Sequence, residues 1–250
     1  MARTGQPATR QVAAVQRAIA ILDELADARS ELGTNEIARR TGINVSTISR
    51  ILATLTSGGL VEHVAVTGRY RLGVGVIRLA SAVGDRLDIR SLARPHLAEL
   101  ASRTQETATL SVPGGHEPIT LDYVQSPLSV RSVAEVGRAS AAHATAVGKV
   151  FLAHGGSVPD GQLQAFTERT IVDHDVLRAD VAGVRERGWG QALGEREEDL
   201  NAVAVPVLDP AGQLAAILGV QGPAVRFSPR VMRSAVELLT ERAERISAAL

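Results

Sequence analysis

The chain has 250 residues, of which 45% are hydrophobic and 22% are charged, and this balance is typical of a folded globular protein. It contains no cysteine, which excludes disulfide bonds, zinc sites built on cysteine and thiol catalysis. Only 2% of the residues are aromatic, so side chains for stacking unpaired bases are scarce and a reader of single-stranded nucleic acid is not expected.

The formal net charge of zero combines two parts of opposite sign. Residues 1–80 contain ten Arg and six acidic residues, a balance of +4, whereas residues 81–250 contain 17 Lys or Arg and 21 acidic residues, a balance of −4. A basic part and an acidic part indicate different partners. The N-terminus lacks the pattern of a signal peptide and no segment reaches the ~18 apolar residues of a membrane helix, so we expect a cytoplasmic protein.

The first 60 residues predict a helix-turn-helix. Apolar side chains recur at every third or fourth position through QVAAVQRAIAILDELADA, residues 11–28, which indicates a helix. Thr34 is expected to cap a short helix over NEIARRT, and Gly42 to end it in the left-handed conformation. Asn44 then caps a third helix, which a Gly-Gly pair terminates. Helix, short helix, glycine turn and helix are the parts of a helix-turn-helix.

The third helix, which follows the glycine turn in the stretch TGINVSTISRILATL, residues 41–55, has two different sides. One side carries a stripe of Ile and Leu that a core can bury. The other side carries small hydroxyl side chains and one arginine, namely Ser46, Thr47, Ser49 and Arg50. Small hydroxyls allow a helix to lie close in the major groove of DNA, and an arginine there can bind guanine or phosphate. The alternative is that Ser46 caps the helix and that the other side chains are only solvated.

Two strand-like runs follow, LVEHVAV and RYRLG, and the Thr67-Gly68 pair between them indicates a hairpin. A hairpin after the third helix is the wing of a winged helix. Arg69 and Arg71 lie on one side of its second strand, within reach of a phosphate backbone. The turn, the wing and the local positive charge together predict a DNA interface. The predicted phosphate contacts are Gln16, Arg17, Ser46, Arg69 and Arg71, and the predicted base contacts are Thr47, Ser49 and Arg50.

The rest of the chain predicts a linker and a second domain. Residues 73–105 are helical in pattern, with Pro95 beginning or kinking a segment. The strand-like runs ETATLSV, PITLDYV, VRSVAEV, NAVAVPVL and QLAAILGV then alternate with helical HATAVGKVFLAH, DVLRADVAGVRERG and SPRVMRSAVELLTERAERISAAL. This succession predicts an α+β domain with a largely antiparallel sheet. We assign residues 1–73 to the winged helix-turn-helix, 74–90 to a linker helix and dimer contact, and 91–250 to the second domain.

The segment HATAVGK, residues 143–149, is the strongest candidate for chemistry in the second domain. It shares only its final Gly-Lys pair with a phosphate-binding P-loop, so a nucleotide triphosphatase is not expected. A helix that starts near Ala144 presents backbone N–H groups that favour a carboxylate or another anion. His143 either contacts such a ligand or only fixes the loop by hydrogen bonds. Lys149 is expected to be a solvated or structural charge.

Catalysis has little support in the sequence. The six histidines are scattered without the spacing of metal ligands, and the motif G-x-S-x-G is absent. The triplet Asp173-His174-Asp175 lies where a helix N-cap is expected, and Trp189 is expected to be a core anchor for the turn into a strand. We therefore predict no catalytic residue, no metal and no cofactor.

The chain resembles the IclR family of bacterial transcription regulators from about Val12 to Arg226. The segments that carry the resemblance are VQRAIAILDELA, EIARRTGINVSTISRILATLTSGGLVEH, GRYRLG, HATAVGKVFLA, RERGWG and NAVAVPVLDPAGQLAAILGVQGP. The resemblance implies a winged helix-turn-helix, a linker helix and a GAF-like α/β effector-binding domain, in dimers that often pair into tetramers. Val45 stands where a proline is common, a departure expected to affect the helix start more than reading specificity.

The resemblance also implies a ligand pocket between the HATAVGK helix start and the central sheet. Carried over residue by residue, the effector-binding positions are Ser132, Ser140, Ala146, Val147, Ala202, Gly219 and Gln221, with Glu195 at the rim. His143 is added to them because it directly precedes the helix start. The alternative for Glu195 is that the run EREED is a solvated turn. Some relatives carry Cys or Ser at positions 202, 219 and 221, so the identity of the ligand does not transfer.

From the resemblance and the domain order we predict a ligand-responsive repressor, not an enzyme. It is expected to bind a palindromic operator as a dimer or pair of dimers, with recognition helices ~34–36 Å apart in successive major grooves. Its effector is expected to be a small organic, sugar or aromatic acid. Two alternatives stay open: an enzyme of a small metabolite with an N-terminal interaction domain, and a constitutive DNA-binding protein whose second domain only oligomerises.

Overall fold

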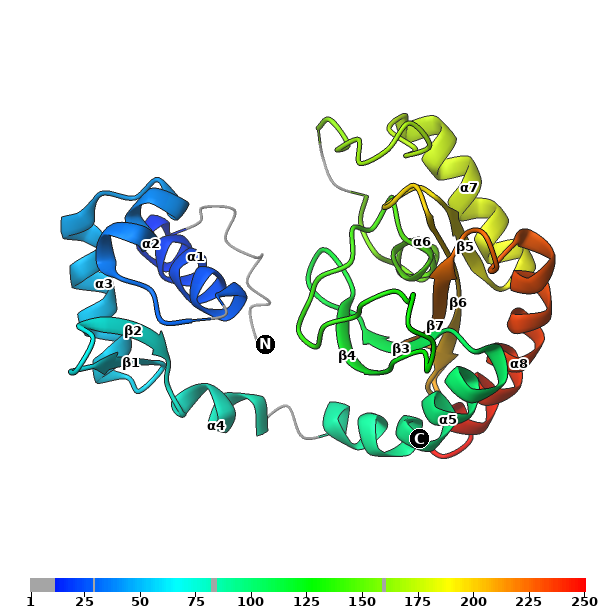
Figure 1. Ribbon diagram of the computed structural model, residues 1–250, viewed down its shortest axis with the longest axis horizontal. Coiled ribbons are helices and arrows are strands. Elements are labelled where there is room, and N and C mark those ends of the chain that lie inside the picture. Colours follow the sequence, from blue (N-terminus) through cyan, green and yellow to red (C-terminus); the bar gives the residue numbers. More distant parts are fainter. Residues whose placement is uncertain (1–11, 29, 82–84, 159–160) are drawn as a thin grey trace, which may run out of the picture. The chain divides into compact units, whose positions relative to one another are not determined.

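The protein is described by a computed structural model that places residues 12–28, 30–81, 85–158 and 161–250. It separates into two compact units, Met1–Gly84 and Asp85–Leu250, and each unit is described by itself (Figure 1). The predicted linker, residues 74–90, spans this division, and its residues 82–84 lie outside the described ranges. No helix in the described ranges is long and apolar enough to cross a membrane.

The first unit is a helix-turn-helix followed by a small hairpin, as the sequence predicts. Its elements are α1 (Ala13–Asp27), α2 (Thr34–Thr41), α3 (Val45–Ser57), β1 (Val61–Val64), β2 (Arg69–Leu72) and α4 (Gly75–Ser81). The strands β1 and β2 pair antiparallel. The loop after α1 joins the hairpin because the backbones of Leu32 and Tyr70 exchange two hydrogen bonds. The core between the three helices contains fully buried Ile21, Ile37, Ile48 and Leu52.

Short polar residues and glycines set the ends of these helices. Oδ1 of Asn44 accepts a hydrogen bond from the backbone N–H of Thr47 at 2.9 Å, so Asn44 caps α3 as predicted. Gly42, with φ of +69°, ends α2 in the left-handed conformation. The prediction that Thr34 caps α2 is wrong. The extended residue before that helix is Gly33, whose carbonyl accepts the first helical hydrogen bonds, and Thr34 is already helical.

The second unit contains a five-stranded antiparallel sheet with the strand order β4-β3-β7-β6-β5 (Figure 1). Its elements in chain order are α5 (Asp85–Thr104), β3 (Thr107–Val112), β4 (Ile119–Val124), α6 (Ala146–Ala153), α7 (His174–Arg187), β5 (Gly190–Leu193), β6 (Leu200–Leu208), β7 (Leu214–Pro223) and α8 (Pro229–Ser247). Pro95 lies inside α5, and Asp173 caps α7 by accepting two backbone N–H bonds. The antiparallel α+β prediction is therefore confirmed.

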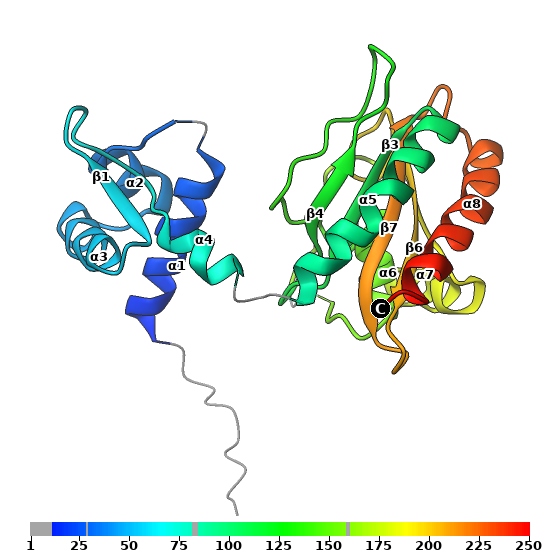
Figure 2. The ribbon, with the colours of Figure 1, turned by 90° about the horizontal axis from the view of Figure 1, so that it is seen from below.

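The two faces of the sheet are covered differently because successive strand residues point to opposite sides. On one face, α5 and α8 lie side by side and pack on alternate residues of β3, β6 and β7, such as Leu110, Val205 and Leu218 (Figures 1 and 2). On the other face, α6 and α7 pack on residues such as Ala204 and Ile217. The side chains of β3 that alternate with its apolar core residues are hydroxyls, and these face the α6 side.

One predicted strand is absent. VRSVAEV, residues 130–136, alternates apolar and polar side chains, but the structure forms a loop there. The edge strand β4 is hydrogen-bonded to residues 137–139 instead, and residues 130–136 form no strand pairing. Val130, Val133 and Val136 are consequently 67%, 61% and 54% exposed.

Candidate nucleic-acid interface and ligand pocket

The exposed side of α3 holds the residues predicted to read DNA. Ser46, Ser49 and Arg50 are exposed and Thr47 is half-buried. The hydroxyl of Ser46 donates to Oδ1 of Asn44, and that of Ser49 donates to a backbone oxygen one turn earlier. Each hydroxyl keeps its acceptor lone pairs, which suit the amino groups of cytosine and adenine in the major groove. Donation to a phosphate requires the hydroxyl to leave its internal partner.

A groove of about 500 Å³ between α1 and α3 brings predicted contacts of both helices together. Arg17, Thr47 and Arg50 line it, beside apolar side chains of the two helices. Gln16 is exposed next to Arg17 on α1. Within the described part of the chain, neither the guanidinium group of Arg17 nor that of Arg50 makes a hydrogen bond or an ion pair. Both guanidinium groups are therefore available to an anion at this surface.

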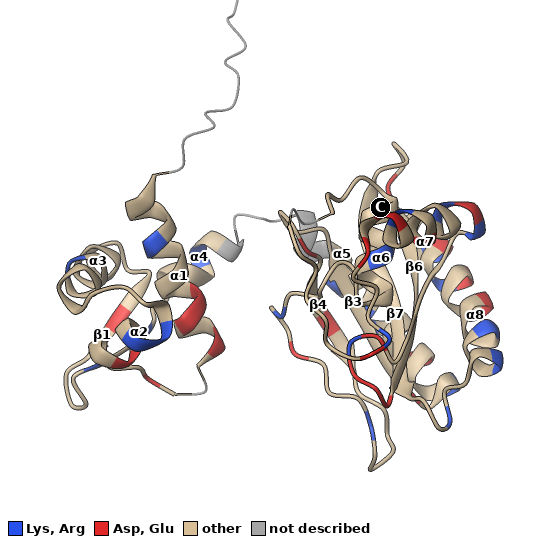
Figure 3. Cartoon of the chain, turned by 90° about the horizontal axis from the view of Figure 1, so that it is seen from above, with Lys and Arg blue, Asp and Glu red and all other residues tan. Residues whose placement is uncertain are grey.

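The wing arginines, in contrast, are held by acidic residues. Nε of Arg71 donates to the carboxylate of Glu62 at 3.0 Å, and Arg69 donates to the backbone oxygen of Glu31 at 2.7 Å and lies 3.6 Å from the carboxylate of Glu36. The hydrogen bond from Arg71 lowers the pKa of Glu62, and the same bond raises the pKa of Arg71. Basic and acidic residues are interspersed in this unit (Figure 3). Phosphate contacts from the wing therefore require these bonds to be exchanged or shared.

The second unit contains a pocket of about 90 Å³ between the sheet, the start of α6 and two loops. Thr109 and Ser111 of β3 and Thr120 of β4 line it and are all buried. Its edge carries charged residues of the two loops, namely Glu135 and Arg138 of one and Arg196 and Glu197 of the other. The pocket thus has a buried hydroxyl floor and a charged rim.

Ser111 is the unsatisfied polar group of the floor. It is 1% exposed, and its Oγ has no hydrogen-bond partner among the described residues. A buried polar group left without a partner costs about 1–3 kcal/mol, a cost that a polar ligand can remove.

The start of α6 adds backbone donors to the same pocket. Thr145 caps the helix, and its Oγ1 accepts a hydrogen bond from the N–H of Gly148 at 3.0 Å. Ala146 and Val147, the first helical residues, line the pocket. Because N–H groups in a first helical turn have no partner within the helix and lie at its positive end, this end of the pocket favours an anion.

Residues 132–140 form one wall and are bonded to the sheet at both ends. At one end, Nε2 of Gln221 donates to Oγ of Ser132 at 2.8 Å. At the other end, the backbone of Thr120 is hydrogen-bonded to residues 137 and 138. The wall is therefore held by residues that themselves line the pocket.

Six of the nine predicted effector-binding residues line this pocket, namely Ser132, Ser140, Ala146, Val147, Ala202 and Gln221. Gly219 lies behind the floor, since a Cβ at this position would come within 2.8 Å of Oγ1 of Thr109. His143 lies outside the lining. Its Nε2 is 2.9 Å from the backbone oxygen of Gln164, and its ring stacks on Phe166, so its contacts are those of a residue that fixes the loop.

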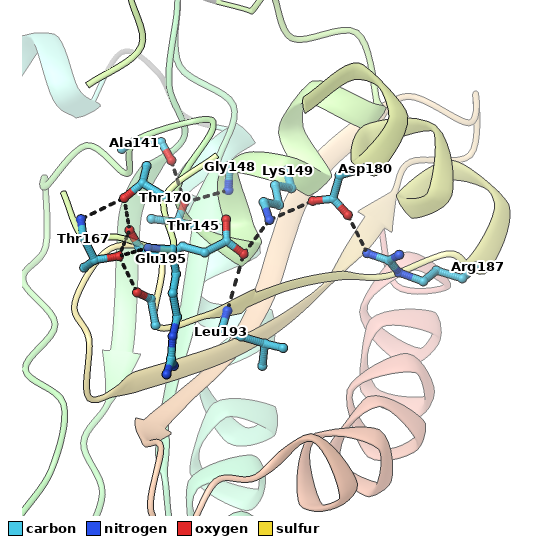
Figure 4. Close-up of polar contacts among 12 residues, drawn as sticks. Ala141, Thr145, Gly148, Lys149, Thr167, Thr170, Asp180, Arg187, Leu193 and Glu195 are labelled. Carbon is cyan, nitrogen blue, oxygen red and sulfur yellow. Dashed lines mark hydrogen bonds and ion pairs between the residues drawn. The ribbon is translucent and has the colours of Figure 1, made fainter. Parts of the chain in front are cut away.

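Glu195 does not line the pocket, because its carboxylate faces Lys149 of α6 (Figure 4). Nζ of Lys149 lies 2.7 Å from Oε1 of Glu195 and 2.7 Å from Oδ2 of Asp180 in α7, and Lys149 is 1% exposed. Lys149 is therefore a structural charge and not a solvated one. The next two residues of the chain, Arg196 and Glu197, lie at the rim in place of Glu195. The alternative that Glu195 lies in a solvated turn is also wrong, because its side chain is buried.

The floor of the pocket was not predicted from the sequence. Thr109, Ser111 and Thr120 were not among the predicted residues, and neither were the four charged residues of the rim. A signal for the floor was present in β3, TATLSV, where hydroxyl residues alternate with apolar ones. Such alternation places the hydroxyls together on one face of the sheet.

Comparisons with known proteins cover both units. Residues 14–65 match the family model of the IclR helix-turn-helix domain, and residues 81–248 match that of the C-terminal domain of the bacterial transcriptional regulator IclR. The chain is 32% identical over 242 residues to the HTH-type transcriptional regulator BhcR of Paracoccus denitrificans, covering 94% of this chain and 86% of that protein. It is 28% identical to the HTH-type transcriptional repressor AllR of Salmonella typhimurium, covering 99% and 96% of the two chains.

A solved structure is similar over the full length. An IclR homologue from Microbacterium hydrocarbonoxydans, complexed with 4-hydroxybenzoate, superposes with a TM-score of 0.77 at 26% identity, covering 94% of this chain and 98% of that chain. The two matching models and the full-length relatives exclude the enzyme alternative. The chain belongs to the IclR family and is a DNA-binding transcriptional regulator with an effector-binding domain.

Proposed function

We propose that this regulator is a repressor whose affinity for a palindromic operator is changed by a small organic or aromatic acid bound in the pocket of the second unit. The observation that carries the proposal is the buried, unpartnered hydroxyl of Ser111 in a pocket that also receives the start of α6. The chain is proposed to act in the bacterial cytoplasm as a dimer or pair of dimers.

The proposed DNA contacts are those on the surface of α1, α3 and the wing. Arg17, Thr47 and Arg50 share one groove, and Gln16, Ser46 and Ser49 are exposed on the same two helices. Arg69 and Arg71 are proposed to contact phosphates after exchanging their acidic partners. Repression is supported by the name of a relative, the AllR repressor, and an acid effector by the 4-hydroxybenzoate complex of another.

The proposed gating requires that the effector bind two arrangements of the protein with different affinities. A difference of this kind changes operator affinity by a coupling of typically ~1–3 kcal/mol. The pocket suits this task because a ligand in it contacts two loops at once, the wall of residues 132–140 and the rim at Arg196 and Glu197. Residues 74–90 are proposed to link the winged helix-turn-helix, 1–73, to the effector domain, 91–250, and to transmit the difference.

Substitutions in the pocket test the gating. Operator DNA, found by genome-wide selection with the purified protein, is titrated with and without a panel of organic, sugar and aromatic acids. We expect at least one acid to change the operator affinity of the wild type about 5- to 150-fold. Ala146→Leu, which fills the pocket, is expected to abolish this response and to keep DNA binding.

Because Ala146 is fully buried, Ala146→Leu can disturb the fold, so a second variant is needed. Gln221→Leu removes the hydrogen bond to Ser132 with little change in volume and is expected to weaken the response with the melting temperature retained. A wild type whose operator affinity is unchanged at saturating concentrations of every acid contradicts the gating and favours a constitutive DNA-binding protein.

A further inference from the structure

The size of the pocket restricts the class of its ligand. Its volume of about 90 Å³ is smaller than the roughly 150 Å³ of an engineered apolar cavity that accepts benzene. It also lies below the ~300–1,000 Å³ of a typical drug-sized site. None of the residues that line it is aromatic, so it offers no face on which an aromatic ring can stack. These features favour a short aliphatic ligand.

The polarity of the lining demands hydroxyl groups on that ligand. Hydroxyl or amide side chains line the pocket on the sheet, the wall and the helix start, namely Thr109, Ser111, Thr120, Ser132, Ser140, Thr145 and Gln221. Ser111 has no hydrogen-bond partner among the described residues. A ligand group that bonds to it must be polar and small enough to reach the floor. A ligand with hydroxyls on adjacent carbons matches this density of donors and acceptors.

The charges of the lining indicate a single carboxylate. The start of α6, at Ala146 and Val147, supplies N–H groups at its positive end. The acidic residues of the lining, Glu135 and Glu197, are exposed at the rim. The basic residues of the lining, Arg138 and Arg196, belong to the same two loops, so the rim carries charges of both signs, and the buried helix start is the part of the lining that favours one carboxylate.

We infer that the effector is a short aliphatic hydroxy acid with one carboxylate, of about three or four carbons. Its carboxylate binds at the N–H groups that begin α6, and its hydroxyls bind on Ser111 and the neighbouring floor residues. This ligand class rests on the proposed function only for the effect of the ligand on operator affinity, because binding of the ligand to the pocket is measurable without DNA.

Calorimetry on the full-length protein tests the ligand class. The probes are glycerate and threonate, with glycerol as the analogue that lacks the carboxylate, propionate as the one that lacks hydroxyls, and 4-hydroxybenzoate as the aromatic acid. We expect at least one of the two hydroxy acids to bind about tenfold or more tightly than each of the other three. Tighter binding of 4-hydroxybenzoate, or no binding of either hydroxy acid, overturns the inference.

Ser111→Ala separates a binding role from a structural one. Because Oγ of Ser111 has no partner among the described residues, its removal is expected to leave the melting temperature of the unliganded protein unchanged or raised. The same change is expected to lower the affinity for the hydroxy acid about tenfold, which corresponds to the loss of one hydrogen bond. Ser91→Ala, at an exposed serine of α5 on the opposite face of the sheet, is the matched control and is expected to change neither quantity.

The outcomes distinguish the ligand class from the proposed gating. A lower melting temperature with unchanged affinity for Ser111→Ala assigns Ser111 to the fold and overturns its place in the site. A hydroxy acid that binds the protein without changing operator affinity leaves the ligand class in place and contradicts the gating. A regulator that responds on DNA only to aromatic acids keeps the gating and overturns the ligand class.

Discussion

Arg50 and Arg71 are both exposed arginines of the winged helix unit, but their surroundings differ. Arg50 has no ionic partner within the described ranges and shares the α1/α3 groove with Arg17. Arg71 donates a hydrogen bond to the carboxylate of Glu62. This bond must be broken or shared when Arg71 contacts a phosphate. The loss of an existing ion pair offsets part of the gain from a phosphate contact, so the two residues are expected to contribute unequally to DNA binding.

We predict that Arg50→Ala lowers affinity for the selected operator about tenfold or more, because an arginine contact to a guanine is worth about 1–3 kcal/mol. Arg71→Ala is expected to lower operator affinity less, because in the wild type the Arg71 side chain must give up its bond to Glu62 when the protein binds DNA. Fluorescence anisotropy with labelled operator measures both affinities. The melting temperature is expected to stay close to that of the wild type because Arg50 is exposed.

Arg103→Ala, which removes one exposed positive charge from α5, is the control for net charge. It is expected to leave operator affinity nearly unchanged. Equal affinities for the Arg50 and Arg103 variants would place the DNA surface elsewhere than α3.

Single residues were predictable from sequence where their role is local. Asn44 caps α3 and Gly42 ends α2 because each acts on backbone groups within three residues. Glu195 was not predictable in this way, since its partner Lys149 lies 46 positions earlier and the two meet only after α6 packs on the sheet. Ser111 belongs to the same class, because its place in the pocket depends on the pairing of β3 with β4 and β7.

At the scale of elements, a buried charge cluster joins α6, α7 and the loop after β5 (Figure 4). Lys149 provides the cation, and Glu195 and Asp180 provide the anions. Arg187 lies 3.6 Å from the second oxygen of Asp180. The cluster holds the residue that directly precedes the rim of the pocket, so it fixes where Arg196 enters the site.

We predict that Lys149→Met lowers the free energy of unfolding of the second unit by about 3–5 kcal/mol, because Glu195 then stays buried without its cation. Trp189 is the single tryptophan of the chain and adjoins β5 in that unit, so its fluorescence during denaturant titration measures the change. The double variant Lys149→Met with Glu195→Leu is expected to recover most of the loss, since no unpaired carboxylate remains at residue 195. A double variant as unstable as the sum of the two single variants would show that the pair is not the origin of the effect.

The elements themselves were largely predictable, because most of them have clear periodicity and bounding glycines or caps. VRSVAEV is the exception among the predicted strands, since alternation of Val with polar residues is necessary for a half-buried strand and does not supply a neighbour to pair with. The edge of β4 is hydrogen-bonded to residues 137–139, and residues 130–136 form no strand pairing. A sequence pattern indicates that a segment can form a strand, but it does not indicate whether the edge of the sheet is already paired with another segment.

At the scale of the whole molecule, the two units divide the function between them. The winged helix-turn-helix presents arginines and hydroxyls on one surface, and the effector domain holds a small polar pocket. The charge balance of the sequence, +4 in residues 1–80 and −4 in residues 81–250, follows the same division. This organisation was predictable from the sequence because it depends on the order of elements, whereas the shape of the pocket depends on long-range packing and was not predictable.

This chain is proposed to recognise a specific operator through the first unit. The most direct measurement is a titration of the purified protein against DNA upstream of its own gene, or against the fragment enriched by genome-wide selection, at several salt concentrations beside an unrelated fragment of equal length. The predicted result is a preference of about 10³-fold or more for the operator, with affinity that falls as salt rises because of the phosphate contacts. Equal, weak binding to both fragments, with no fragment enriched from the genome, would contradict the claim.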